Sequence, residues 1–420
     1  MADAPELAPV YGPPADPVEI APRTPVPIAI PTALDRAASI ATATHPVVAA
    51  ADAEADALTA ELRGARRGRY PNLSAELLAA TSGSSIADQD GLALNAVIEQ
   101  PVWAGGRIDG AIRRARASLR AGDSRVDQAQ RRIVERVIAA YYDYVQADER
   151  AAVLQNSLAK HRDLLGSIQR RVQQEVSPQI DFTLGRSRTT QVEVDLTATR
   201  ELRAIARLQL TELTDGADID PTLPPISVAR TVPPEDVALI EAYACDPSLA
   251  VLTNQIAIAE ADSELARAQL LLQVLLQLSQ NEITGTRAAA VLRMRLGNGA
   301  AELTGVDSAD ARILRAIAEF GEAQRRAREE LQRIYIRLRA SSARIAVNEA
   351  AADAADQIVA SYRRQFIAGR RNWLDVMNAV REAADARLAE SDARVTAALG
   401  AAQIMALTCR WQPDTPDAVS

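Results

Sequence analysis

The sequence is poor in aromatic residues, cysteine and histidine. Only 3% of its 420 residues are aromatic, and it contains two cysteines and two histidines. The histidines, His45 and His161, lie far apart, and no metal-ligand spacing, phosphate loop or nucleophile motif is present. We therefore expect no metal site, no cofactor and no enzymatic activity. The apolar content comes from Ala, Leu, Val and Ile, which favours packing between helices.

Lysine is almost absent. Lys160 is the only lysine among 47 basic residues, so the other 46 are arginine. A coding bias is the simplest explanation, although the planar guanidinium also suits ion pairs between helices. Acidic residues outnumber basic ones, which gives a net charge of −8 and a pI of about 5.2. This balance argues against general nucleic-acid binding.

Long apolar runs are missing as well. No apolar run approaches the roughly 18 residues that a membrane-spanning helix needs, so no transmembrane helix is expected. Residues 1–30 are rich in proline and lack the basic and apolar regions of a signal peptide, so we expect a poorly ordered segment. If the protein is exported, its signal peptide is not visible in this sequence.

Apolar residues alternate with polar ones near residues 71–80 and 91–102, after a helical pattern at 31–64. The alternation predicts two strands, each with an apolar and a more polar face. The basic cluster at residues 66–69, just before the first strand, is either a solvated helix end or a contact with anionic headgroups.

The period then changes from strand to helix within a few residues. Pro101 cannot donate to a central ladder, and Gly105 and Gly106, just after Trp103, allow a sharp change of backbone direction. Residues 107–176 contain no proline and could form a helix about 105 Å long. We therefore expect a strand that runs directly into a very long helix.

The same order occurs twice. The spacing from Gly106 to Asp181 is almost the same as that from Gly299 to Asp375, and Gly297 and Gly299 stand where the first half has its paired glycines. The expected organisation begins with a Pro-rich segment at 1–30, followed by repeat 1 at 31–213, whose long helices are at 107–176 and 181–213. A Pro-rich linker at 214–234 leads to repeat 2 at 235–408, which has strands near 271–280 and 289–297 and helices at 300–368 and 374–408. Residues 409–420 form a tail.

The second long helix also has heptad spacing, which predicts coiled-coil packing. The residues that step by four and three are Ala327, Leu331, Ile334, Leu338, Ser341 and Ile345.

Four amphipathic strands of about ten residues could each cross a bilayer when tilted, but they cannot close a barrel. An open edge in lipid would leave backbone groups unsatisfied, so several chains would have to share one barrel. Arg293 and Arg295 fall on the more polar face and would then point into a watery lumen. A soluble sandwich with one wet face is the alternative.

These features together resemble the TolC family of outer-membrane channel proteins over about residues 32–410. The segments that carry the resemblance are 70–73 (YPNL), 100–106 (QPVWAGG) and 366–379 (FIAGRRNWLDVMNA). The resemblance implies an α+β membrane protein of the bacterial outer membrane: a homotrimer whose twelve-stranded β-barrel sits in outer-membrane lipid above an α-helical periplasmic tunnel. It also implies two partners, a periplasmic adaptor and an inner-membrane ABC or proton-driven transporter.

In that family the helix turns at the periplasmic end form a gate. The resemblance implies that Asp375 belongs to a ring of aspartates, and that Asp181 and Arg371 belong to a salt-bridge network that holds the gate closed. Phe366 stands where the family can have tyrosine. Asn378 stands where it can have a second ring aspartate, which argues against strong cation selectivity. The alternative for the two aspartates is simple helix N-capping.

Cys245 and Cys409 each lie near the end of a helical unit. The implied fold places both near the middle belt of the tunnel, where an oxidising periplasm would permit a disulfide. Two separate buried thiols are the alternative.

The cargo is open at this stage. Residues 372–382 (NWLDVMNAVRE) resemble the branch used in type I protein secretion, and the absence of a cysteine near the N-terminus argues against the lipoprotein drug-efflux branch. A drug or metal efflux pump is the first alternative, and a soluble coiled-coil scaffold or adaptor without a channel is the second.

Overall fold

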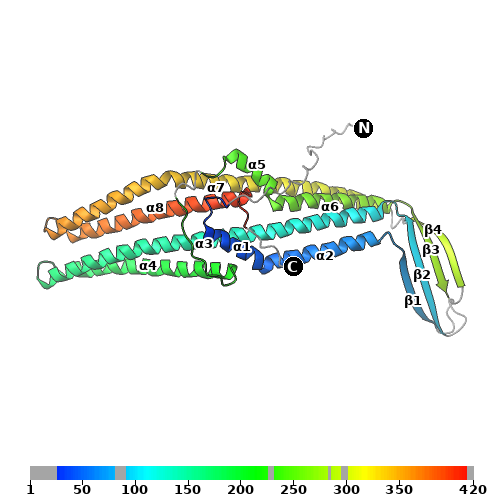
Figure 1. The fold of residues 1–420 in the computed structure, drawn as a ribbon, viewed down its shortest axis with the longest axis horizontal. Helices are drawn as coiled ribbons and strands as arrows, with labels where there is room; N and C mark the ends of the chain where they lie inside the picture. The colour runs from blue at the N-terminus through cyan, green and yellow to red at the C-terminus, as the bar shows by residue number, and fades with distance from the viewer. Residues whose placement is uncertain (1–25, 81–90, 226–230, 282–284, 295–300, 414–420) are drawn as a thin grey trace.

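The computed structural model describes residues 26–80, 91–225, 231–281, 285–294 and 301–413, and within them one order of elements occurs twice (Figure 1). The first half comprises α1 (Thr32–Thr44), α2 (Pro46–Arg67), β1 (Asn72–Ala80), β2 (Gly91–Trp103), α3 (Arg107–Gln173) and α4 (Gln179–Leu213). The second half comprises α5 (Glu235–Cys245), α6 (Pro247–Gln269), β3 (Gln273–Asn281), β4 (Gly285–Arg293), α7 (Ala301–Ile367) and α8 (Trp373–Leu407).

Two constant offsets in residue number relate the halves. The first offset is the number of residues from the start of α2 to the start of α6, and the same number separates the starts of β1 and β3. The second offset separates the starts of β2, α3 and α4 from the starts of β4, α7 and α8, respectively. The second offset is smaller by seven, because ten residues separate β1 from β2 but only three separate β3 from β4. The long helices α3 and α7 have 67 residues each, and α4 and α8 have 35 each. The internal duplication predicted from the sequence is confirmed.

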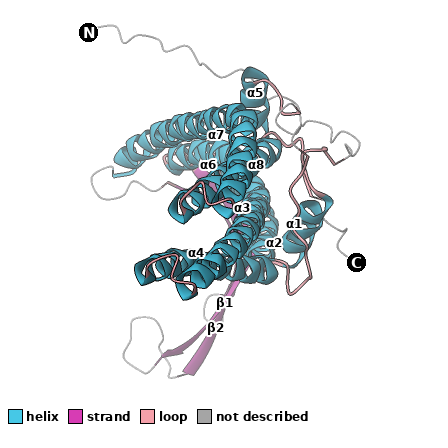
Figure 2. Ribbon diagram, turned by 90° about the vertical axis from the view of Figure 1, so that its left-hand side faces the viewer, coloured by secondary structure: helices cyan, strands magenta, loops and turns pink. Residues whose placement is uncertain are grey.

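The helices form an elongated layer. The long helices α3 and α7 run its length, with α2 and α4 end to end beside α3, and α6 and α8 end to end between α3 and α7 (Figure 1). Viewed along the long axis, the layer is curved, and α1 and α5 lie outside it (Figure 2). The helix α3 therefore has short helices on both flanks, whereas α7 has the α6–α8 row on one flank.

The heptad seam predicted on α7 packs against α8. Leu331, Ile334, Leu338, Ser341 and Ile345 are all buried. Gly400 of α8 lies against this seam, where a Cβ would make ordinary contacts with Leu338 and Ile334 at 3.5 and 3.8 Å. The coiled-coil packing expected from the sequence is confirmed.

Arginine ion pairs also join the helices. Arg113 and Arg114 of α3 pair with Glu264 and Asp262 of α6, at nitrogen–oxygen distances of 2.5 and 2.6 Å. These pairs are about half exposed, so each stabilises the fold by at most about 1 kcal/mol.

The four strands form one antiparallel sheet in the order β1-β2-β3-β4. The register aligns the apolar residues of all four strands on one face, where Leu73, Leu77, Leu94, Ile98, Leu276, Leu278 and Leu292 are exposed. The opposite face has Ser74, Glu76, Asn95, Glu99, Gln277, Ser279, Arg287 and Arg293. Among the described strands, the outer edges of β1 and β4 have no neighbour.

Three expectations need correction. The helix expected at 31–64 is broken into α1 and α2, because Pro46 lacks an N–H and starts a new helix. His45 is the N-cap of α2, and its Nδ1 accepts a hydrogen bond from the N–H of Val47 at 3.2 Å. The strand expected at 289–297 is β4 at 285–293, because its pairing with β3 begins at Gly285, opposite Asn281. Of the segment expected to be poorly ordered, Ala29 and Ile30 are buried in the core around α1, α3 and the end of α8.

The ends of the long helices fall within three residues of the sequence-based expectation. In the part of the chain that the structure describes, no helix combines the length and apolar character needed to cross a bilayer.

Candidate functional site

The turn between α7 and α8 brings together several residues that the sequence singles out. The Nε of Arg371 donates to the Oε1 of Gln365 at 3.0 Å, and its Nη1 lies 3.4 Å from the Oδ2 of Asp375. The guanidinium carbon also lies 3.8 Å from the ring centroid of Tyr362. Arg371 therefore joins the last turn of α7 to the first turn of α8, with a third of its side chain exposed (32%).

A small apolar core lies behind this turn. Phe366 and Trp373 are buried with Ile168 of α3 and with Met377. The guanidinium of Arg171, near the end of α3, lies 4.9 Å from the ring centroid of Phe366. Trp373 is thus a packing residue, and the turns at the ends of α3 and α7 are held together.

Asp181 and Asp375 occupy equivalent positions in the two repeats, in the first turns of α4 and α8. The N-cap residues are Pro178 and Asn372, so the alternative that the aspartates are N-caps is wrong. The Oδ1 of Asn372 is the group that accepts from the helix, from the N–H of Leu374 at 3.2 Å. A carboxylate one turn into a helix is still favoured by the helix dipole.

The structure does not bring Arg371 and Asp181 together within one chain. Arg371 pairs with Asp375 instead, and no ion pair or hydrogen bond of the Asp181 side chain is found among the described residues. Asn378 is exposed one turn beyond Asp375. A role for these residues in a gate stays a prediction.

The strand-to-helix transition has the geometry that its residues require. Pro101 pairs with Leu275 of β3 and lies beyond the last residue of β2 that pairs with β1. The register of the β2–β3 pairing shifts between Pro101 and Trp103. The side chain of Trp103 is half exposed. Gly105 and Gly106 both adopt positive φ, at +58° and +86°. Gly297 and Gly299 of the second transition lie outside the described residues.

We expect Gly105→Ala to destabilise the protein more than Gly106→Ala. A Cβ at Gly105 would lie 2.7 Å from the Cβ of Leu271, whereas a Cβ at Gly106 meets nothing within 4 Å. The positive φ costs about 1 kcal/mol at each site, and the clash adds roughly 1–3 kcal/mol at Gly105 alone. Unfolding midpoints of both variants would check this, and equal shifts would contradict it.

The polar face of the sheet contains an ion pair that the sequence did not reveal. The Nη2 of Arg293 on β4 lies 3.1 Å from the Oε1 of Glu99 on β2, across the intervening strand. Arg293 had been singled out for its face alone, and its acidic partner could not be found because the two residues belong to different repeats. Arg295 lies outside the described residues.

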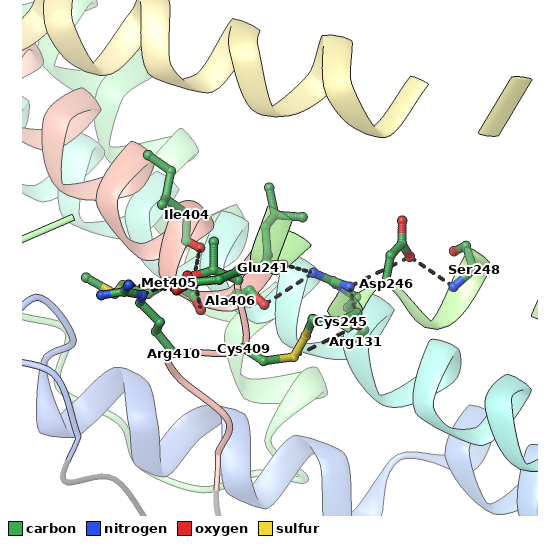
Figure 3. Close-up of a disulfide and its surroundings, with 12 residues drawn as sticks. Arg131, Glu241, Cys245, Asp246, Ser248, Ile404, Met405, Ala406, Cys409 and Arg410 are labelled. Atoms are coloured by element: carbon green, nitrogen blue, oxygen red, sulfur yellow. Dashed lines mark hydrogen bonds and ion pairs between the residues drawn. A yellow bond between two sulfur atoms is a disulfide. The ribbon is translucent and has the colours of Figure 1, made fainter. Parts of the chain in front are cut away.

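Cys245 and Cys409 are joined by a disulfide, with their Cα atoms 6.1 Å apart and a sequence separation of 164 (Figure 3). The bond connects the end of α5 to the residue after the C-cap of α8. Arg131 of α3 lies beside it and donates to main-chain carbonyls of both segments. Sequence reasoning missed Arg131, since an arginine in a long helix has no pattern that marks it as buried.

Two equivalent tyrosines hold the connector between the repeats. The hydroxyl of Tyr141 donates to the carbonyl of Thr222 at 2.9 Å, and that of Tyr335 donates to the carbonyl of Pro233 at 2.7 Å. The tyrosines occupy equivalent positions in α3 and α7, so the duplication could have revealed them. Within the described residues, no group of three or more His, Cys, Asp or Glu side chains is placed to hold a metal ion.

Residues 37–216 match a family model described as "Outer membrane efflux protein". Solved structures match almost the whole chain, among them a membrane protein from Pseudomonas aeruginosa with 17% identity and a TM-score of 0.78, covering 95% of this chain and 99% of that one. The chain has the outer-membrane channel fold.

Two further structures with this fold are outer-membrane proteins by their titles. The outer membrane protein VceC of Vibrio cholerae has 18% identity and a TM-score of 0.75, covering 89% of this chain and 96% of that one. The open state of the MtrE outer membrane channel of Neisseria gonorrhoeae has 17% identity and a TM-score of 0.74, covering 91% and 90%.

A search of curated proteins finds no match. The family model and the solved structures concern efflux and channel proteins, in agreement with the expectation that the chain is not an enzyme.

Proposed function

We propose that three copies of this chain form a channel that passively conducts substrates across the bacterial outer membrane. The observation that carries the proposal is the four-stranded sheet, which exposes one apolar face and, among the described strands, has two unpaired edges. A lone sheet of this kind would leave edge N–H and C=O groups unsatisfied in lipid. Three copies supply twelve strands, enough to close a barrel with its apolar face toward lipid.

Exposed apolar side chains on the outer helices support assembly. On α4 they are Val194, Leu202, Ile205 and Leu208, and on α7 they are Leu314, Ile336, Val347 and Ile358. These two helices lie at opposite edges of the curved layer, so the edge of one copy can cover the edge of the next (Figure 2). Exposed apolar stripes of this extent are typical of interfaces between chains.

In the assembled channel the polar face of the sheet lines the lumen, with the Arg293–Glu99 ion pair on its wall. The helices extend the lumen as a tunnel, and the turns that contain Arg371, Asp181 and Asp375 form the gate at its far end. A ring of aspartates at a constriction favours cations. A periplasmic adaptor and an inner-membrane transporter supply the substrate and the energy.

The cargo that best fits the comparisons is a small molecule expelled by a drug or metal efflux pump, because the family model that matches is described by efflux. Type I protein secretion is the second candidate, favoured by the segment 372–382 (NWLDVMNAVRE).

The mass of the detergent-solubilised protein tests the assembly. Light scattering is expected to give a protein mass of three chains of 45.0 kDa, stable on dilution. A variant with Ile336→Arg on the exposed flank of α7 should form fewer trimers. A protein that is monomeric and soluble without detergent would overturn the channel and favour a soluble scaffold.

A further inference from the structure

A binding site for an arginine side chain, here called the socket, occurs at equivalent places in the two repeats. An arginine of the same chain fills one copy, and the other copy is open. In the filled copy, Arg131 of α3 reaches between the end of α5 and the end of α8, and only 14% of its side chain is exposed (Figure 3). Its Nη1 donates to the carbonyl of Cys245 at 3.2 Å, and its Nη2 donates to the carbonyls of Leu407 and Ala406 at 2.8 and 3.3 Å.

The contacts of Arg131 satisfy groups that helix ends leave without partners. The last carbonyls of a helix have no intrahelical donor and carry partial negative charge. A guanidinium can serve several of them at once, since its five N–H groups are held in a planar fork. Asp246 and Glu135 add carboxylates, each 3.7 Å from the arginine.

The duplication places a second copy of this socket in the first repeat. The two offsets relate Cys245 to Thr44, and Ala406 and Leu407 to Glu212 and Leu213. Thr44, Glu212 and Leu213 line an open cavity of about 810 Å³ between the α1–α2 junction, α3 and the end of α4. Among the described residues, no hydrogen bond is donated to the carbonyls of these three residues.

The charges around the open socket favour an incoming cation. Asp143, Glu212 and Asp215 line it against Arg136 and His45. Burial raises the pKa of Asp143, and burial together with Arg136 lowers the pKa of His45. At Asp143 burial is the cause of the shift and no nearby cation offsets it among the described residues, so an incoming guanidinium would supply a partner.

The residue equivalent to Arg131 is Arg325 on α7. The local sequences match, since residues 129–132 and 323–326 both read AQRR, and a glutamate follows at Glu135 and Glu329. Arg325, however, is 74% exposed, and its ion pair within the described part of the chain is with Glu322 of its own helix, at 3.1 Å. Such an exposed pair holds the side chain weakly.

The arrangement of helices shows how the two could meet. In one chain, α3 lies against the α6–α8 row that forms the filled socket, whereas the α2–α4 row has α3 on one flank. The free flank of α7 and the free flank of the α2–α4 row lie at opposite edges of the layer (Figure 2), and Arg325 is an exposed residue of α7. When copies close into a ring, these two edges meet.

We propose that Arg325 of one chain enters the open socket of the next chain and donates to the carbonyls of Thr44, Glu212 and Leu213, as Arg131 does within one chain. The inference rests on the proposed trimer. It assigns the cavity to a second copy of this chain and gives each interface one buried arginine near the middle of the helical layer.

Cross-linking tests the contact. The double variant Arg325→Cys with Asp215→Cys, treated with a short bismaleimide in detergent, is expected to give covalent dimers and trimers on a denaturing gel. Asp215 suits the test because the equivalent residue is Cys409, and the two have similar φ values of 50° and 52°. Each single variant should stay monomeric on the gel.

A second comparison measures the strength of the contact. Arg325→Met should weaken trimer association about tenfold or more at each interface, because the socket carbonyls lose a charged donor. Arg326→Met is the matched control, since Arg326 is 76% exposed and pairs with the same Glu322.

If the wild type is a trimer, but the double cysteine variant does not cross-link and the two methionine variants associate equally well, the socket contact is overturned while the channel stands. A wild-type monomer would overturn both.

Discussion

Replacing Arg371 with serine is expected to raise the mean conductance of the channel by increasing the fraction of time that it is open. The substitution removes the contacts of Arg371 with Gln365, Asp375 and the ring of Tyr362, which hold the first turn of α8 to the end of α7. Serine should be tolerated there, because Ser177 occupies the equivalent position in the first repeat.

The size of the effect follows from the proposed threefold assembly. A partly exposed arginine–carboxylate pair contributes about 0.5–1 kcal/mol. Three chains open together, so the closed state loses roughly 1.5–3 kcal/mol, which is about tenfold to a hundredfold in the open-to-closed ratio. Single-channel recordings measure this ratio directly.

Arg370→Ser is the matched control for this experiment. Arg370 is the preceding residue and is exposed, so its loss should leave the open fraction unchanged. A channel that responds equally to both substitutions, or to neither, would contradict the gate assignment and leave the channel itself intact.

Removing the disulfide is expected to cause a large loss of stability. Cys245→Ser with Cys409→Ser should lower the free energy of unfolding by about 2–4 kcal/mol, because the bond closes a long loop and restricts the unfolded chain. The denaturant midpoint of the variant in detergent, compared with that of the wild type, measures this loss.

The first repeat offers the control for the disulfide. Thr44→Ser with Asp215→Ser changes the equivalent positions, which have no bond, and should lower the midpoint much less. Adding a reductant to the wild type should reproduce the shift of the cysteine variant. A wild type whose midpoint is insensitive to the reductant would contradict a structural role for this bond.

The long helices and the duplication could be predicted from the sequence because they depend on local signals. The proline-free spans, the glycines at the transition and the heptad seam of Leu331, Ile334 and Leu338 each identify their element without knowledge of the fold. The position of β4 was missed because Ala288, Ala289 and Ala290 have no alternation, so pairing with β3 sets the register.

The candidate site could be predicted only in part. Phe366, Arg371 and Asp375 meet at one turn because they lie close together in sequence. The resemblance implies that Arg371 and Asp181 belong to one salt-bridge network, but within one chain Arg371, in the turn before α8, pairs with Asp375, only four residues farther along the sequence. Arg131 and Glu99 were missed because their partners lie in the other repeat, where sequence spacing gives no signal.

The most direct test of the central claim is the current through a planar bilayer that contains the purified wild-type protein. The proposed trimer predicts discrete, uniform conductance steps with infrequent openings, because in that proposal twelve strands close a barrel and the turns around Arg371 act as its gate. Folded protein that inserts into the bilayer and gives no conductance steps would contradict the channel.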